Sequence, residues 1–564
     1  MTATTTAPAN HAGEDSDATT TPTVEVELVR TTGTARRSDD DRIVALFGFP
    51  GLTHLGEALD RHRAAKDPRG RRPAYPALAL LATAACARIT GSQASALTTL
   101  AKPELWERCR EAFLTLTEIE LPDRAPNREH IREFRADVTA RLATMDDLSE
   151  SFTDAAVGQA RHLGNLLAGV APDWASPDAR HLVFGDGTIV ARYSNAEVIV
   201  CPVTGRKVLT GSRARTIDSA RIQKEFRVSG ADDKHSSGIN NVGLHTRTAF
   251  GPITLATDIE LGAEQWTALD LLDRLVRRAG NGIHTLVYDG AITGWSVEYA
   301  MARHGIQVMG KVPAASSKKD AHVYAKEQID AYVTSVARER GLKVRNGGRI
   351  DKILRSDVLG QMYRGELPTV IGTSVYPPST PNGQFDVVYS TYLFSTATHT
   401  TDAGPCEHTL VLDDGALFTV AIDPVSELLV KEEYLPAISS VRHVRPRGLW
   451  GTTTEFLVPC ASGDFAWTVT WDPRATRYTR DSKEEGRSPD DPIGWRLRTT
   501  PRFDRERHRF VDTARNDSES LNKAFKDTLP NKRGASITGQ GQRLDYLLFG
   551  VVRNSDTWLA YTQP

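Results

Sequence analysis

The sequence has 564 residues, 40% of them hydrophobic and 25% charged, and its formal net charge is −2. This composition is ordinary for a globular protein, and the length corresponds to about three or four domains. No apolar run reaches the roughly 18 to 20 residues of a membrane span, and the N-terminus lacks the basic and then apolar layout of a signal peptide. We therefore expect a cytosolic protein that makes no membrane contact.

Several common motifs are missing from the sequence. It contains no GxGxxG, Walker or GxSxG pattern, so nucleotide cofactors and serine hydrolysis have no support. The cysteines form neither a CxxC pair nor a Cys/His pair at the usual zinc spacing, and we expect them to be reduced and structural. These cysteines are Cys86, Cys109, Cys201, Cys406 and Cys460. The small net charge neither favours nor excludes a nucleic-acid partner.

The N-terminal part of the chain divides into two segments. Residues 1–40 are rich in Thr, Ala and acidic residues with hardly any apolar periodicity, which predicts a disordered leader. Residues 41–165 predict an all-helical domain, with "PALALLATAACARI" typical of a buried helix and "NREHIREFRADVTARLATM" of an amphipathic one. "RITGSQASALTTLAK" is compatible with a helix-turn-helix, although such turns join helices of every kind. We interpret this segment as a candidate DNA-binding domain.

Residues 175–313 predict a mixed sheet with helices on its faces. The expected strands lie at 181–193, 239–250, 252–261, 284–291 and 306–313, and the expected helices at 263–280 and 293–305. Gly251 and Pro252 are expected to form the tight turn between the second and third strands. The order β-β-β-α-β-α-β implies an antiparallel meander that leads into parallel strands. Ligands gather at strand ends near a reversal of strand order in such sheets.

Residues 314–500 predict a β-rich domain inserted into the sheet domain. The charged, partly helical "KEQIDAYVTSVARERGLKVRNGGRIDKIL" is followed by short β-like runs such as "EHTLVLDDGALFTVAI" and "FAWTVTW". Residues 501–564 return to helix, first at "ARNDSESLNKAFKDTLPNKR" and then at "GQGQRLDYLLFGVVRNSDTWLAY". The second of these helices is apolar enough to pack against the sheet.

Two aspartates interrupt apolar strands of the expected sheet. Asp186 lies in "GDG" and Asp289 in "YDG". A carboxylate in a short β-forming run is unfavourable unless water, a hydrogen bond or a cation compensates it. Each Asp alone is equally compatible with a turn residue, because "DG" is a common turn dipeptide. Two of them in one sheet suggest a shared cation.

A third acid lies on the expected helix at 514–533. Arg515 and Glu519 are four residues apart and share a face, and Lys526 lies two turns further along the same side. An exposed Arg–Glu pair that contributes about 0.3–0.5 kcal/mol would explain this spacing equally well.

Arg515-x3-Glu519-x6-Lys526, downstream of Asp186 and Asp289, resembles the DDE transposases of bacterial insertion sequences, in particular the branch with a Tyr-x2-Arg-x3-Glu-x6-Lys signature and a β-rich insertion. The resemblance runs from about His181 to the C-terminus, and "RRPAYPALALL" and "REHIREFR" are similar to the helical domain of related transposases. It implies an α/β fold: an RNase H-like mixed sheet with flanking helices, interrupted by the β-rich insertion and preceded by the all-helical domain. The Tyr of the signature falls on Asp512, which leaves its phosphate contact without a counterpart.

The resemblance also implies a chemistry. Two Mg²⁺ or Mn²⁺ ions about 3.5–4 Å apart would serve an in-line displacement at phosphorus, with Asp186 bridging both ions, Asp289 holding one and Glu519 the other. Arg515 and Lys526 would contact DNA phosphates, the first through its planar fork. Three further expected DNA contacts are Lys532 and Arg533 in "NKRG" and, by stacking on a displaced base, Trp450, for which a core position is the alternative.

The function implied is that of a transposase that binds the ends of its insertion sequence and catalyses metal-dependent strand cleavage and strand transfer. Its partners would be double-stranded DNA, as element ends and as target, and a second copy of the chain in a homodimer on the DNA. The location implied is the bacterial cytoplasm, on the nucleoid when DNA is bound. Two alternatives stay open: a domesticated or inactive DNA-binding derivative, and a glycosidase that uses Asp and Glu.

Overall fold

The structure is a computed structural model. It describes residues 37–64, 74–192, 197–200, 202, 207–210, 224–227, 235–310, 372–375, 387–390, 392–402, 404–413, 415–422, 424–425, 429–444, 448–471, 473, 497–501, 503–534, 536 and 538–563. The predicted leader, apart from residues 37–40, and the charged stretch at 326–354 lie outside these residues.

Eight helices occupy the described part of residues 39–162. They are α1 (Asp39–Phe47), α2 (Gly51–Ala64), α3 (Ala77–Ala85), α4 (Ala87–Thr90), α5 (Gln93–Leu100), α6 (Pro103–Thr117), α7 (Arg128–Thr139) and α8 (Leu142–His162). Pro103 is the first residue of α6, and Asn127 and His130 form a capping box at the start of α7. The single helix predicted at 127–145 was wrong. The apolar periodicity runs on from Val138 to Met145, but Arg141 is extended and separates two helices.

A seven-stranded mixed sheet follows the helices. Its strands are β1 (Leu182–Arg192), β4 (Lys224–Arg227), β5 (His235–Thr248), β6 (Gly251–Ile259), β7 (Thr285–Val287), β8 (Gln307–Met309) and β18 (Arg533–Gly534). β1, β5 and β6 pair in antiparallel fashion, whereas β1, β7 and β8 pair in parallel. The predicted meander leading into parallel strands is therefore confirmed. The turn lies two positions earlier than predicted, because Thr248 pairs with Gly251 and leaves Ala249 and Phe250 as the turn. A separate hairpin is formed by β2 (Glu197–Val200) and β3 (Lys207–Thr210).

Helices cover both faces of the sheet. On one face α9 (Glu264–Ala279) and α8 share a core with β1, β5 and β6. On the other face the core contains residues of α13 (Arg505–Asp527) and α14 (Gly539–Thr562). α10 (Trp295–Tyr299) continues into a π-helical turn (Ala300–His304) between β7 and β8, which ends at Gly305. Short 3-10 turns lie at Ala179–His181, Gly280–Gly282 and Pro530–Lys532.

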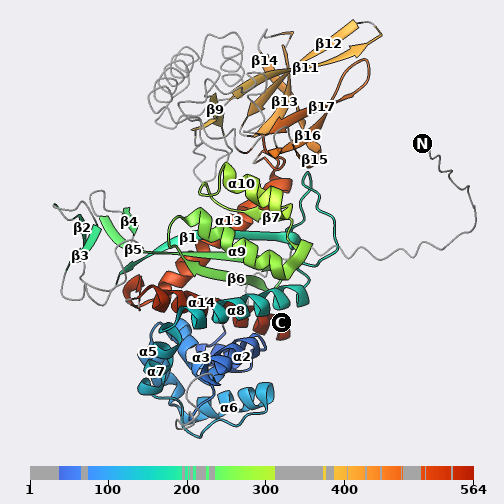
Figure 1. The fold of residues 1–564 in the computed structure, drawn as a ribbon. Helices are drawn as coiled ribbons and strands as arrows, with labels where there is room; N and C mark the ends of the chain where they lie inside the picture. Colours follow the sequence, from blue (N-terminus) through green and yellow to red (C-terminus); the bar gives the residue numbers. More distant parts are fainter. Residues whose placement is uncertain are drawn as a thin grey trace, which may run out of the picture. The chain divides into compact units, whose positions relative to one another are not determined.

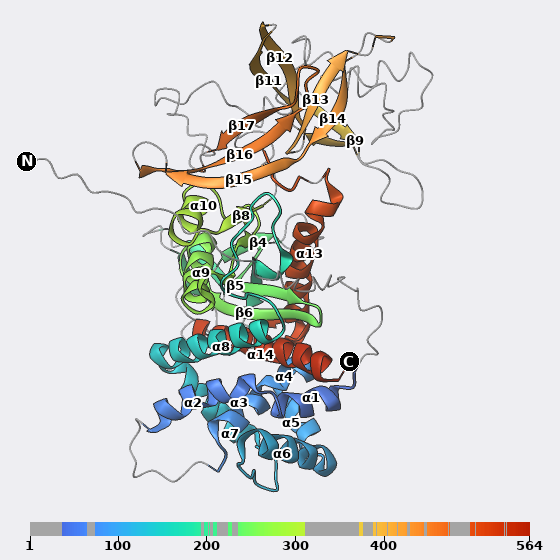
Figure 2. The same ribbon diagram turned by 90° about the vertical axis from the view of Figure 1, so that its right-hand side faces the viewer.

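α14 joins the sheet to the N-terminal helices. It runs between β6 and helices α1 to α4, and both views show it there (Figures 1 and 2). Leu544, Leu547 and Val551 are fully buried in the core that the N-terminal helices build. Asp545, next to Leu544, is 1% exposed and lies 2.8 Å from Arg135 and 3.7 Å from Arg88. The last helix of the chain therefore completes the core of the first helices.

The described part of the insertion is β-rich. A four-stranded sheet contains β11 (Tyr392–Thr401), β12 (Gly404–Asp413), β13 (Ala416–Ile422) and β14 (Leu429–Leu435). A three-stranded sheet contains β15 (Ala437–Val444), β16 (Trp450–Val458) and β17 (Phe465–Trp471), and β9 (Gly372–Val375) pairs with β10 (Val387–Ser390). The two larger sheets share one core, in which Leu410, Phe456 and Val469 are buried. None of the helices in the described ranges has the length and apolar character needed to cross a membrane.

Candidate functional site

The pairing of β1 with β7 brings Asp186 and Asp289 together. The two strands are parallel, and Phe184 lies opposite Val287. Asp186 and Asp289 each lie two residues after this pair, so Asp289, just past the end of β7, lies beside Asp186 within β1. Their oxygen atoms lie within 4.8 Å of each other and of a third carboxylate, that of Glu264. We refer to Asp186, Glu264 and Asp289 as the carboxylate cluster.

Glu264 is held in the cluster by hydrogen bonds from two neighbouring side chains. It is the first residue of α9, its Oε2 accepts a hydrogen bond of 2.9 Å from Asn240 Nδ2 on β5, and its Oε1 accepts one of 3.0 Å from Tyr288 Oη. An acid in the first helical turn is also favoured by the helix dipole. These contacts fix the carboxylate beside β1.

The glycines around Asp186 make room for this arrangement. A Cβ at position 187 would lie 2.5 Å from the carboxylate carbon of Glu264, and a Cβ at position 185 would lie 2.7 Å from the carbonyl oxygen of Gly243. By contrast, a Cβ at Gly290, which follows Asp289, would meet nothing within 4 Å. The "GDG" of β1 is therefore a packing requirement of the cluster, whereas the glycine of "YDG" is not.

Burial and mutual repulsion disfavour the charged forms of the carboxylates in the cluster. Burial raises the pKa of Asp186 to about 6, and the neighbouring Asp289 and Glu264 add to the rise. Burial likewise raises the pKa of Glu264. Crowded carboxylates of this kind repel one another unless a proton or a cation neutralises them. Because Mg²⁺ and Mn²⁺ prefer carboxylate oxygens, the three side chains fit a divalent cation of that class.

Helix α13 faces the cluster from the other side. Asn522 Nδ2 donates a 2.9 Å hydrogen bond to Asp186 Oδ2, and the Gly187 N–H donates one of 2.9 Å to Oδ1. Burial lowers the pKa of Lys526, although the charge of Asp186 opposes that shift. A cavity of about 330 Å³ lies between the helix and β1. The residues that line it are Asp186, Gly187, Thr188, Glu519, Asn522, Lys523, Lys526, Asp527 and Lys532.

The predicted third acid lies in this cavity but outside the cluster. The Glu519 side chain is 62% exposed, and its Oε1 is 3.5 Å from Arg515 Nε. It lines the cavity together with Asp186, but it is not among the carboxylates that approach one another within 4.8 Å. The structure therefore brings Asp186 and Asp289 into contact range and leaves Glu519 on the facing helix.

The other predicted contacts fall in two places. Lys532 lines the cavity and lies 3.0 Å from Asp527, and Arg533 is exposed on β18, opposite Ala191 of β1. Trp450 lies elsewhere, where β16 meets α10. Its backbone N–H donates to Glu298 Oε1 at 3.2 Å, and the Arg442 guanidinium lies 5.1 Å from its ring centre. The ring is partly exposed, not a core residue. The side chain of Asp512 lies outside the described structure.

The sequence interpretation missed two residues of the site. Asn522 had a readable signal, since it follows Glu519 by three residues and Arg515 by seven and so shares their helix face. Glu264 had none, because its position depends on the register of β1 against β5 and on where α9 begins.

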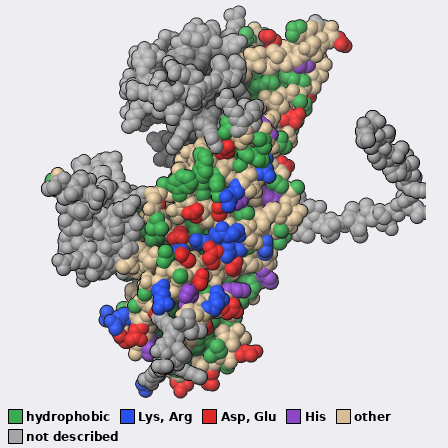
Figure 3. Space-filling model, in the orientation of Figure 1, with side chains coloured by type: hydrophobic (Ala, Val, Ile, Leu, Met, Phe, Trp, Pro, Cys, Tyr) green, Lys and Arg blue, Asp and Glu red, His purple; other side chains and the backbone are tan. Residues whose placement is uncertain are grey.

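Charges on the α8 and α9 side of the sheet are mostly paired. Basic and acidic side chains are interspersed over these helices in Figure 3. Arg274 Nε lies 2.9 Å from Glu150 Oε1, and Arg278 contacts both Glu150 and Asp154. The cations at the cavity come instead from α13 and the turn that follows it.

Gly187→Ala is expected to weaken binding of Mn²⁺ to the cluster by about tenfold or more. The new methyl group must displace the Glu264 carboxylate or shift β1, and overpacking of this kind costs about 1–3 kcal/mol. The matched control is Gly290→Ala, which also follows an aspartate of the cluster but has open space around it. Isothermal titration with Mn²⁺ measures both variants, and equal affinities would contradict the packing argument.

Comparison with known proteins adds no assignment, because no model of a protein family and no curated protein matches the chain.

Proposed function

We propose that this chain is a DDE transposase, which binds the ends of its own DNA element, cleaves the DNA with the help of divalent metal ions and joins the ends to a target. The observation that carries the proposal is the carboxylate cluster, whose Asp186 lines one cavity together with Lys523 and Lys526 of helix α13. The sheet, with three antiparallel strands that lead into two parallel ones, is compatible with the RNase H-like fold that the resemblance implies. The β-rich insertion between β8 and α13 fits it as well.

The chemistry proposed is phosphoryl transfer. Two bound Mg²⁺ or Mn²⁺ ions would activate the attacking oxygen and stabilise the leaving one. In this chain Asp186 and Asp289 would hold the ions, and Asn522 would fix the orientation of Asp186 through its hydrogen bond to Oδ2. Lys526, Arg515 and Lys532 would contact the phosphates on either side of the reacting one.

We assign the third metal-ligand position to Glu519 and a positioning role to Glu264. Both carboxylate oxygens of Glu264 accept hydrogen bonds from the protein, whereas Glu519 is exposed in the cavity beside Arg515. DNA that approaches through the cavity would meet Glu519 first. Glu264 would shape the electrostatic field behind Asp186.

The test is cleavage of labelled DNA that carries the sequences flanking this gene, with Mg²⁺, Mn²⁺ or EDTA. Glu519→Gln is expected to reduce cleavage by about 10³-fold or more, which corresponds to roughly 4 kcal/mol of transition-state stabilisation, while DNA binding is retained. Glu264→Gln is expected to reduce it by only about tenfold. The matched control is Glu506→Gln, an exposed acid in the first turn of the same helix, which should cleave like wild type.

Two outcomes would count against the proposal. Specific binding without cleavage in either metal would favour the inactive DNA-binding derivative. Loss of cleavage in Glu264→Gln with full activity in Glu519→Gln would exchange the roles of the two glutamates.

A further inference from the structure

A second group of metal-ligating side chains lies in the insertion, where its core reaches one end of the β11–β12 hairpin. Ala397 on β11 and Leu410 on β12 point into the shared core and are fully buried. Side chains two residues apart on a strand share a face, so His399, His408 and Cys406 continue this inward-facing row. The row thus changes from apolar residues to two imidazoles and a thiol within one hairpin.

The fourth member comes from the other sheet. Cys460 lies in the turn between β16 and β17, and its sulfur lies 3.5 Å from Cys406 Sγ. His399 Nε2 lies 3.2 Å from Cys460 Sγ, and His408 Nε2 lies 3.3 Å from Cys406 Sγ. All four donor atoms lie within 4.8 Å of one another. Two imidazoles and two thiols therefore converge on one point from two sheets.

The spacing suits a metal better than a disulfide. A tetrahedron with Zn–S bonds of about 2.3 Å and Zn–N bonds of about 2.0 Å separates neighbouring donors by about 3.3–3.8 Å. The measured separations of 3.2–3.5 Å are close to this range. A disulfide needs the two sulfurs about 2.05 Å apart, and it would leave both imidazoles without a role.

The surrounding residues hold the donors in place. The Ser462 N–H lies 3.4 Å from Cys460 Sγ and donates to it, and the Cys460 N–H donates to Asp464 Oδ1 at 3.2 Å. The ring of Phe465 stacks on His399 at 4.0 Å. Contacts of this kind orient metal ligands in known sites.

We propose that His399, Cys406, His408 and Cys460 bind one structural Zn²⁺ ion. Two thiolates and two imidazoles in a tetrahedron form a closed site for zinc, with no position left for substrate. Harder ions such as Mg²⁺ disfavour these ligands, so the site is distinct in chemistry from the carboxylate cluster.

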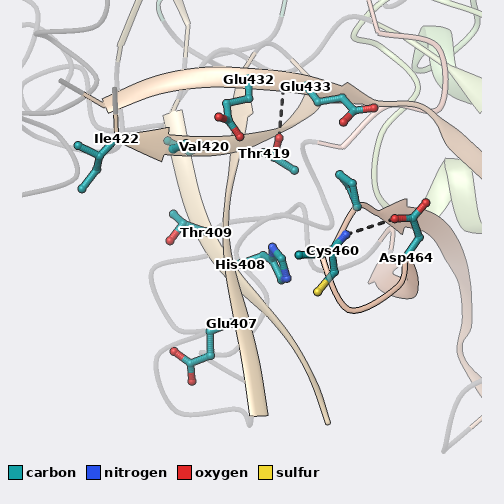
Figure 4. A pocket seen from close by; sticks show the side chains of 13 residues that line it. Glu407, His408, Thr409, Thr419, Val420, Ile422, Glu432, Glu433, Cys460 and Asp464 are labelled. Carbon is teal, nitrogen blue, oxygen red and sulfur yellow. Dashed lines mark hydrogen bonds between the residues drawn. The ribbon is translucent and has the colours of Figure 1, made fainter. Parts of the chain in front are cut away.

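The ion would tie the β11–β12 hairpin to the turn after β16. A cavity of about 600 Å³ beside the site gives the ion a route from solvent (Figure 4). In that view the His408 ring lies next to Cys460, whereas Glu407, the residue between Cys406 and His408, points away from them. Glu407 is exposed. It therefore serves as a control residue that adjoins two ligands in sequence but is not one of them.

The expectation that these cysteines are merely structural and unconnected to metal was drawn from spacing alone. Cys406-x-His408 places two ligands on one strand face, a spacing that zinc fingers do not use, and Cys460 follows 52 residues later. Only the pairing of β11 with β12 and the packing of the two sheets bring the four side chains together.

The experiment is metal analysis of the full-length protein purified from zinc-supplemented medium. Wild type is expected to retain about one zinc per chain after dialysis, and Cys406→Ser and Cys460→Ser are expected to lose most of it. Glu407→Gln and Asp186→Asn should keep the metal, and the second of these separates the site from the carboxylate cluster. Cobalt-loaded wild type should show visible absorption of tetrahedral Co²⁺ with thiolate charge transfer. This spectrum does not depend on whether the serine variants fold.

The proposal is overturned by any of three results. The first is zinc content that is unchanged in the cysteine variants. The second is wild type that binds neither zinc nor cobalt at this stoichiometry. The third is an intact mass that reveals a Cys406–Cys460 disulfide in the metal-free protein.

Discussion

Asp186→Asn is expected to abolish cleavage and, in the same protein, to raise the stability of the metal-free form. The cleavage loss, about 10³-fold or more, follows from removing the carboxylate at the centre of the cluster. The stability gain follows from removing a charge that is buried and faces Asp289 and Glu264. Asn keeps the size of Asp and can still accept the hydrogen bond from the Gly187 N–H.

The pH dependence of this gain has a defined sign. The pKa of Asp186 is raised from 3.8 to about 6 in the folded protein, so the folded state binds more protons than the unfolded chain between these values. The free energy of unfolding of wild type therefore falls as pH rises through this window, by about 1–3 kcal/mol. The free energy of unfolding of Asp186→Asn does not fall in this way. The stability that the variant gains over wild type should therefore be small at pH 4 and complete above pH 6.5.

Thermal melts in EDTA from pH 4 to pH 8 measure this difference, and melts with excess Mn²⁺ supply the control. Metal binding should stabilise wild type and reduce or reverse the advantage of the variant. If the variant were less stable than wild type at pH 7.5 in EDTA, the charge of Asp186 would not destabilise the metal-free protein, contrary to this prediction.

Asp545→Ala is expected to destabilise the protein by about 3–5 kcal/mol. Burial raises the pKa of Asp545, but Arg135 and Arg88 outweigh burial and hold that pKa below its ordinary value. Removing the carboxylate would leave the Arg88 guanidinium, 4% exposed, without its compensating charge. Breaking a buried pair in this way costs much more than the pair itself contributes. Urea denaturation followed by tryptophan fluorescence measures the change.

Two comparisons isolate the buried charge. Asp556→Ala removes a partner of Arg42 that is 23% exposed, and a loss of about 1 kcal/mol or less is expected. Arg88→Met combined with Asp545→Leu should recover much of the stability that Asp545→Ala loses, because both members of the buried pair are then apolar. If Asp545→Ala and Asp556→Ala lose equal stability, the burial argument fails.

Much of the sheet domain could be predicted because its signals are local. The apolar runs of β1, the amphipathic period of α9 and the glycine that ends α9 all lie within short windows. The break between α7 and α8 could not be found in this way, because the apolar period continues across it. The packing of α14 against the first helices depends on contacts between residues more than 400 positions apart, such as Arg135 and Asp545, which no local pattern encodes.

The same difference between local signals and distant contacts applies to the residues of the candidate site. Asp186 and Asp289 could be chosen because a charged residue in an apolar strand is conspicuous in the sequence. Glu264 could not, because an acid at the start of a helix is ordinary, and only Gly187 reveals that its carboxylate needs space beside β1. Cys460 likewise becomes significant only when β16 and β12 are in place.

The position of α13 also has a consequence for biosynthesis. The hydrogen bond from Asn522 to Asp186 spans 336 residues, so the two walls of the cavity leave the ribosome far apart in time. β1 and β7 can pair early, because both precede the insertion, whereas helix α13 emerges only after the whole insertion. The nascent chain would thus carry the carboxylate cluster without the lysines of α13 until translation is nearly complete. Under the function proposed above, a partly synthesised polypeptide would lack Glu519 and so be unable to cleave DNA.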